Sequence, residues 1–190
     1  MAVKESSDEL NPSVVVDHAG VTPKRRLHSP GDYLALAVAT CGVGYFPIAP
    51  GTFGSMVGVA IYLALARLLN SSPLFLTTEL ILVTLIALIG IWAATRTEKL
   101  SGRKDPGKVV VDEVAGQLIA LLPITPTLNV DWTNIVSAFL LFRLFDIIKP
   151  YPARRLESLE SGLGIMADDI VAGAYAAVVV SVIVVLRSLI

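Results

Sequence analysis

The chain has 190 residues, of which 54% are hydrophobic and 16% charged, against about 25% charged residues in an average soluble domain. Its 15 Lys and Arg residues and 16 Asp and Glu residues nearly cancel to a net charge of −1, so no basic field exists of the kind that attracts nucleic acid. The single cysteine, Cys41, excludes an internal disulfide and a cysteine-rich metal site.

Residues 1–32 differ in composition from the rest of the chain. They mix acidic and basic residues, contain both histidines and have no long apolar run, which is typical of a flexible polar tail. They lack the basic-then-apolar order of a secretory signal. We therefore predict a tail over residues 1–32 and a helical membrane domain over residues 33–190.

Six apolar stretches, separated by Gly, Pro and polar segments, are the candidate helices of this domain. They cover residues 33–41, 53–69, 74–95, 109–122, 135–148 and 170–190. The last is long enough to cross a bilayer, which takes about 20 residues. We predict an all-α fold, a compact helical bundle that is polytopic or deeply membrane-embedded. A soluble bundle with an unusually apolar core remains the alternative.

Two basic segments set the expected orientation. Residues 96–108 and 149–155 are rich in Lys and Arg, and such loops stay in the cytoplasm. We therefore expect a multi-pass protein of the cell's inner (cytoplasmic) membrane, with stretches 53–69 and 74–95 crossing the bilayer. The oligomeric state is left open by these patterns.

Five acidic residues interrupt or border the apolar stretches: Asp112, Glu113, Asp146, Asp168 and Asp169. A carboxylate in such surroundings costs several kcal/mol unless it is paired or bound to a metal. Asp112 and Gly116 share one helix face, as do Asp169 and Gly173. Glycine allows close helix approach, so these faces are predicted to meet in a tight crossing. The alternative is that Asp168 and Asp169 only cap a helix.

Arg143, Asp146 and Lys149 are spaced by three residues, next to one another on one side of a helix that ends before Pro150. A simple salt-bridge ladder is the structural alternative to a functional role. Because both histidines lie in the tail, the remaining carboxylates favour a hard ion such as Mg²⁺ over zinc.

Residues 50–55 (PGTFGS) form a glycine-containing turn that opens a helix, with Thr52 as the expected N-cap. Exposed N–H groups at a helix start bind phosphate oxygens, so Gly51, Thr52, Gly54 and Ser55 are candidate phosphate-binding residues. An ordinary helix start would show the same pattern.

Four blocks taken in order are more specific than any one of them. Residues 50–55, 111–116 (VDEVAG), 142–152 (FRLFDIIKPYP) and 162–173 (GLGIMADDIVAG) resemble the phosphatidylglycerophosphatase A family. The resemblance extends from about Leu34 to the C-terminus. Tyr151 stands where the family often has tryptophan, and Ser161 where glycine is common.

The resemblance implies a Mg²⁺-dependent phosphatase that converts phosphatidylglycerophosphate, a membrane phospholipid, to phosphatidylglycerol and phosphate. We expect Asp112, Glu113, Asp146, Asp168 and Asp169 to hold one or two Mg²⁺ ions. Asp112, Asp146, Lys149 and Asp169 are the expected catalytic residues, and Arg143 and Lys149 the expected phosphate holders.

Two questions stay open at this point. Attack by water and a phosphoenzyme on an aspartate both fit these residues. A different class of protein, a small non-enzymatic transporter or scaffold that binds cations through buried carboxylates, is the functional alternative.

Overall fold

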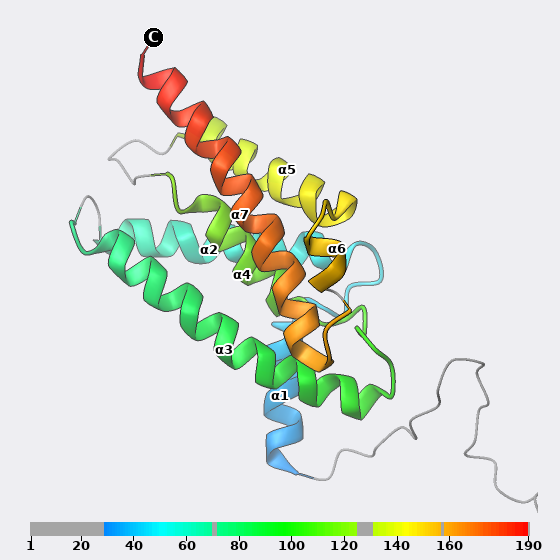
Figure 1. The fold of residues 1–190 in the computed structure, drawn as a ribbon. Helices are drawn as coiled ribbons and strands as arrows, with labels where there is room; N and C mark the ends of the chain where they lie inside the picture. Colours follow the sequence, from blue (N-terminus) through cyan, green and yellow to red (C-terminus); the bar gives the residue numbers. More distant parts are fainter. Residues whose placement is uncertain (1–28, 70–71, 125–130, 157, 190) are drawn as a thin grey trace, which may run out of the picture.

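The computed structural model describes residues 29–69, 72–124, 131–156 and 158–189. These residues form helices and no strand (Figure 1), which confirms the predicted all-α bundle. The helices are α1 (Pro30–Thr40), α2 (Pro50–Leu69), α3 (Phe75–Ser101), α4 (Val111–Leu121), α5 (Trp132–Ile148), α6 (Ala153–Leu156) and α7 (Ser161–Ser188). Residues 1–28, most of the predicted tail, lie outside the described part of the chain.

Helix α1 begins at Pro30, so the end of the predicted tail is helical. Asp32, in its first turn, accepts a hydrogen bond from Ser29 N at 3.1 Å. The same carboxylate pairs with Arg96 Nε at 2.6 Å, which ties α1 to α3. A charged residue that looked like part of a polar tail therefore stabilises a helix start and an interhelical contact.

Helix α3 continues to Ser101, beyond the predicted end at residue 95. Thr97 and Leu100 are buried in the bundle, and the helix stops at Gly102, which has a left-handed φ of 67°. The basic segment 96–108 is thus partly helical. Packing of Leu100 favours the extra turns, although the surrounding residues are polar.

Helix α7 begins at Ser161, well before the predicted start at residue 170. Gly162 lies against the backbone of α3, where an added Cβ would meet Ile91 O and come within 2.6 Å of Thr95 N. Its N–H also donates to Thr95 Oγ1 at 3.0 Å. Asp168 and Asp169 consequently lie inside the helix, so the alternative that they cap it is wrong.

Helix α4 occupies the centre of the bundle, surrounded by α2, α3, α5 and α7 (Figure 1). It crosses α7 at two glycines, as predicted. A Cβ added to Gly173 would contact the Gly116 carbonyl oxygen and lie 3.0 Å from Gly116 Cα, while a Cβ on Gly116 would lie 2.7 Å from Asp169 O. Only glycine allows the two backbones to approach this closely.

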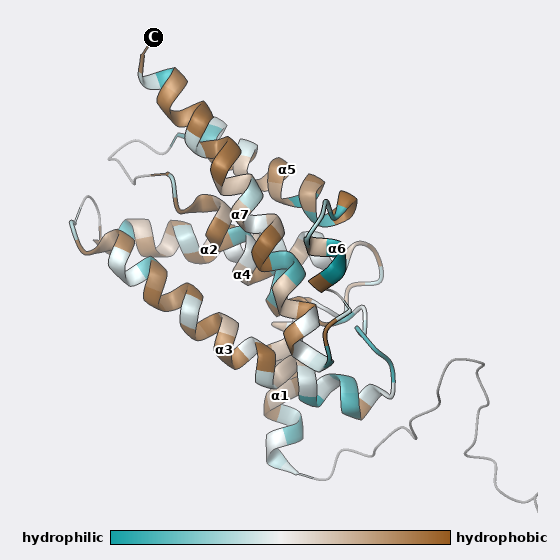
Figure 2. Ribbon diagram, in the orientation of Figure 1, coloured by the Kyte–Doolittle hydropathy of each residue, from teal (hydrophilic) through white to brown (hydrophobic). Residues whose placement is uncertain are grey.

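Helices α2, α3 and α7 are long and apolar enough to cross a membrane. Figure 2 shows hydrophobic residues along most of α3 and the C-terminal half of α7, and their side chains face outward, as at Leu85 and Val182. Such a surface favours lipid over water. The protein is therefore associated with the membrane through these helices, as the three longest predicted stretches indicated.

Candidate active site

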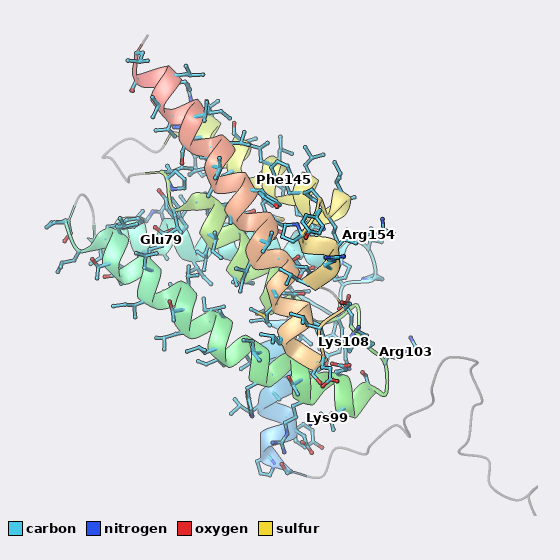
Figure 3. The ribbon with its side chains drawn as sticks, viewed as in Figure 1. Glu79, Lys99, Arg103, Lys108, Phe145 and Arg154 are labelled. Atoms are coloured by element: carbon cyan, nitrogen blue, oxygen red, sulfur yellow. The ribbon has the colours of Figure 1, made fainter. Side chains whose placement is uncertain are left out.

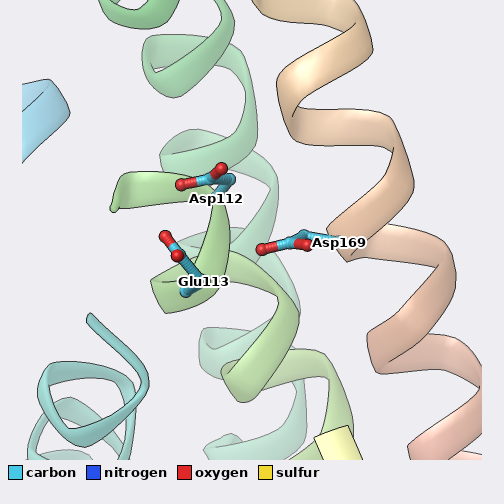
Figure 4. A group of neighbouring side chains, drawn as sticks. All are labelled: Asp112, Glu113 and Asp169. Carbon is cyan, nitrogen blue, oxygen red and sulfur yellow. The ribbon is translucent and has the colours of Figure 1, made fainter. Parts of the chain in front are cut away.

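Three carboxylates from two helices converge at the α4–α7 crossing (Figure 4). Asp112 and Glu113 lie in the first turn of α4, and Asp169 projects from α7. One oxygen of each lies within 4.8 Å of the others. Asp112 and Asp169 are 8% and 3% exposed. We call these three residues the acidic cluster.

The C-terminal end of α5 brings Asp146 to this cluster. Asp146 lies against Asp169, close enough for a hydrogen bond between two carboxyl groups, and lines the same pocket as the cluster. Arg143, one turn earlier, pairs with Asp146 at 2.7 Å between Nη1 and Oδ2. Part of the predicted ladder therefore exists: Asp146 lines the pocket, and Arg143 lies behind it, outside the pocket lining.

Lys149 lies at the site because the α5 helix ends just before it. It is the residue after α5 and has a left-handed φ of 47°, because Pro150 disfavours further helix. Its Nζ lies 2.7 Å from Asp168 Oδ2. Lys149 thus pairs across the bundle with α7, which a plain intrahelical ladder would not produce. Asp168 and Asp169, adjacent in sequence, have different partners.

The predicted phosphate-binding turn is only partly available. Helix α2 starts at Pro50, which has no N–H, and Thr52 N donates to Ala49 O at 3.0 Å, so the prediction that Thr52 is the N-cap is wrong. Ser55 is fully buried and donates its hydroxyl to Gly51 O at 3.0 Å. The structure does not bring Thr52 or Ser55 into the pocket that the cluster lines.

Gly51 and Gly54 do adjoin the site. A Cβ on Gly51 would contact Glu113 Oε1 and lie 3.1 Å from Arg143 Nη1, and one on Gly54 would lie 3.3 Å from Glu113 Cβ. Their role in the structure is to let α2 pack directly against the acidic cluster.

Two charged residues of the pocket were not predicted from the sequence. Lys104 and Asp105, in the loop between α3 and α4, line the pocket beside Asp112 and Lys149. Asp105 has a left-handed φ of 47°. Their closeness in sequence to Asp112 could have indicated a place at the site, but the composition of the segment is that of an ordinary basic loop.

Burial dominates the electrostatics of the α4 carboxylates. It raises the pKa of Asp112 well above its usual range, and the neighbouring Glu113 and Asp169 carboxylates raise it further. Burial also raises the pKa of Glu113, although a hydrogen bond with Asp112 and the positive charge of Arg143 oppose this effect. The cluster therefore has excess negative charge that a cation would relieve.

The donor set fits a divalent cation. Asp112 Oδ1, Glu113 Oε2 and Asp168 Oδ1 are buried and have no hydrogen-bond partner among the described residues. Buried oxygens of this kind usually have partners. Carboxylate oxygens are the ligands that Mg²⁺ prefers, so the residues present suit this ion.

A bundle of apolar helices that holds convergent carboxylates beside two ion-paired cations defines a membrane protein with an acidic site that suits a divalent cation. The family model of phosphatidylglycerophosphatase A matches residues 36–184. The chain belongs to this family. Comparison with solved structures gave no match.

Curated relatives agree with this assignment. A phosphatidylglycerophosphatase A of Haemophilus influenzae is 41% identical over 73% of this chain and 81% of its own length. One of Escherichia coli is 35% identical over 81% of this chain and 84% of its own. A Bacteroides thetaiotaomicron protein with the provisional name phosphatidylinositol-3-phosphatase is 42% identical over 74% of this chain and 87% of its own.

The family assignment makes the chain an enzyme, a phosphatase of phosphoric monoesters, as the resemblance predicted. A non-enzymatic transporter or scaffold does not agree with it. The matched residues include every carboxylate of the acidic cluster.

Proposed function

We propose that the protein is a Mg²⁺-dependent phosphatase that hydrolyses phosphatidylglycerophosphate to phosphatidylglycerol and phosphate. The observation that carries the proposal is the convergence of Asp112, Glu113 and Asp169 within 4.8 Å, beside Arg143 and Lys149, in a chain of this family. The names of two relatives support the choice of substrate.

Each side chain has a distinct task in this proposal. Asp112, Glu113 and Asp169 hold Mg²⁺, with Asp146 and Asp168 completing the acidic wall. When bound, the ion polarises the phosphoryl group and lowers the pKa of a water molecule. Lys149 and Arg143 donate hydrogen bonds to the phosphate oxygens and offset the negative charge that develops during transfer.

The ion pairs around these two cations position them. Asp168 holds the Lys149 ammonium at the pocket wall, 2.7 Å away, and Asp146 holds the Arg143 guanidinium at the same distance. Fixed donors need little reorganisation during the reaction. The pairs therefore orient cations that would otherwise move on long side chains.

The charge distribution supports a cytoplasmic active site in the inner membrane. Figure 3 shows Lys99, Arg103 and Lys108 at one end of the molecule, the end where α7 begins and the α3–α4 loop lies. That loop lines the active-site pocket. Basic loops stay on the cytoplasmic side, so the pocket would open there.

The test is phosphate release from phosphatidylglycerophosphate by the full chain in detergent. We expect release with Mg²⁺, none after chelation with EDTA, and recovery when Mg²⁺ is restored. Full activity in EDTA would overturn the metal assignment. Phosphatidylinositol 3-phosphate is the matched comparison substrate, and preferential hydrolysis of this lipid would overturn the assigned headgroup.

A further inference from the structure

An apolar groove separates α2 from α5 on the outside of the bundle. Every residue that lines it is aliphatic, aromatic or methionine. The main wall residues are Met56, Ala60 and Leu63 on α2, and Phe139, Val136 and Trp132 on α5. The function proposed above assigns no role to this groove.

The groove lies along the same pair of helices, α2 and α5, that make contact beside the active site. At the site, Gly51 of α2 faces Arg143 of α5, where an added Cβ would lie 3.1 Å from Nη1. Helical rise places Met56 about 7.5 Å beyond Gly51, and Phe139 about 6 Å from Arg143. The groove therefore begins within about two helical turns of the residues that are proposed to hold phosphate.

The two walls run antiparallel in one register. Advancing along α2 from Gly51 to Met56 and Leu63 corresponds to moving back along α5 from Arg143 to Phe139 and Trp132. The groove and the Gly51–Arg143 contact therefore lie between the same two helices. A phospholipid whose phosphate lies at the cluster would have its hydrocarbon chains near the groove, which begins about two helical turns away.

The dimensions and surroundings of the groove suit a hydrocarbon chain. From Met56 to Leu63 it extends about 10 Å along α2, and one leaflet of the hydrocarbon core is about 15 Å thick. Helix α2 is long and apolar enough to cross the membrane, and Met56 and Val136 are about half exposed. The far end reaches the ion pair between Asp131 and Arg187, next to Trp132.

We propose that the α2–α5 groove holds one acyl chain of the phospholipid whose terminal phosphate lies at the acidic cluster. This inference rests on the proposed function and adds a second recognition site for the same substrate. The cluster selects the phosphate, and the groove selects a molecule with a long chain. A soluble phosphomonoester would engage only the first.

The test fills the groove from either wall with Ala60→Trp or Val136→Trp. Hydrolysis of long-chain phosphatidylglycerophosphate is compared with that of a short-chain, water-soluble analogue, both with Mg²⁺. We expect kcat/KM for the long-chain lipid to fall at least about tenfold, the scale of discrimination by apolar pockets, with the short-chain value unchanged. Ala174→Trp, at an exposed alanine on α7 outside the groove, is the matched control and should alter neither value.

Other results would overturn the inference that the groove holds an acyl chain. Unchanged long-chain hydrolysis in both filled variants would overturn the inference while leaving the proposed function intact. So would an equal loss on both substrates, which is the result expected if another copy of the chain or a structural contact occupies the groove. A wild-type protein that hydrolyses neither substrate would overturn the proposed function and the inference together.

Discussion

Asp169 and Glu79 are both carboxylates buried in this bundle, but their surroundings differ. Asp169 on α7 meets Asp112, Glu113 and Asp146 in a pocket that also contains Lys149. Glu79 on α3 is fully buried, and neither of its oxygens has a hydrogen-bond partner among the described residues.

The neighbours of Glu79 on its own helix explain the contrast. Phe75 and Val83, one turn away on either side, belong to the main hydrophobic core, so Glu79 occupies an apolar face. In Figure 3 it lies far from Lys99 and Lys108. Burial of a carboxylate is therefore not sufficient to define a site in this protein. Asp169 differs from Glu79 because it lies close to other carboxylates and to a cation, and because it lines a pocket.

The largest expected effect comes from removing one charge of the acidic cluster. We expect Asp169→Asn to lower kcat for phosphatidylglycerophosphate by about 10³-fold, because removing an electrostatic group at a transition state costs up to this factor. Asp131→Asn, at an exposed carboxylate on the far end of α5, is the control. Full Mg²⁺-dependent phosphate release by Asp169→Asn would contradict the assignment of the cluster.

A smaller loss is expected for the cation beside the cluster. Lys149→Met removes a proposed phosphate donor and leaves Asp168 without its 2.7 Å partner. We expect kcat/KM to fall about 10²-fold. Lys99→Met, at an exposed lysine at the same end of the molecule, should change activity little. Similar losses in the two variants would mean that general positive charge matters, rather than the position of Lys149.

The helix crossing that assembles the cluster can be perturbed without touching a charge. In Gly173→Ala, the added Cβ would contact the backbone of Gly116, so α4 and α7 must separate. We expect a loss of about 1–3 kcal/mol in the free energy of unfolding, with a lower phosphatase activity. Gly107→Ala is the control for stability, since no atom lies within 4 Å of its added Cβ. Equal melting temperatures for the two variants would show that the crossing tolerates a methyl group.

The free energy of unfolding of the metal-free protein should depend on pH, because the carboxylates of the cluster repel one another when they are ionised. Burial and the neighbouring Glu113 and Asp169 raise the pKa of Asp112 in the folded protein, so the unfolded chain loses this proton at a lower pH, near about 3.9. Metal-free protein should consequently lose stability as pH rises from that value through the raised pKa. We expect Asp112→Asn to flatten this slope in thermal unfolding with EDTA. An unchanged slope would exclude Asp112 as its source.

The smallest effect on activity is expected at Glu79. Glu79→Met replaces an unpartnered carboxylate by an apolar side chain of similar length in the core. We expect activity to stay at the wild-type value and the free energy of unfolding to rise by about 1–3 kcal/mol. Loss of activity in this variant would show that the two buried carboxylates are functionally linked. It would contradict the conclusion that Glu79 lies outside the active site.

Much of this architecture follows from local sequence. Apolar runs located all six of the larger helices, because burial of an apolar face drives helix packing. Pro150 ended α5 where expected, and the Asp112–Gly116 and Asp169–Gly173 spacings indicated the tight crossing. The candidate metal ligands could be chosen because carboxylates are costly in apolar surroundings.

Other features depend on contacts between distant segments. Packing of Gly162 on α3 moved the start of α7 and placed Asp168 and Asp169 inside a helix. Adjacent residues of a helix point about 100° apart. Asp168 therefore pairs with Lys149, while Asp169 joins the acidic cluster. Local propensity does not specify such partners, since they depend on which helices pack together.

The sequence by itself determined the helices, their apolar surfaces and the types of side chain available for chemistry. Only the tertiary structure decided which of them meet: it buried Ser55, brought Lys104 and Asp105 to the pocket and aligned α2 with α5 along an apolar groove. The physical reason is the separation in sequence of the residues that interact. Helix formation depends on residues a turn apart, whereas a site and the groove beside it depend on packing between helices far apart in the chain.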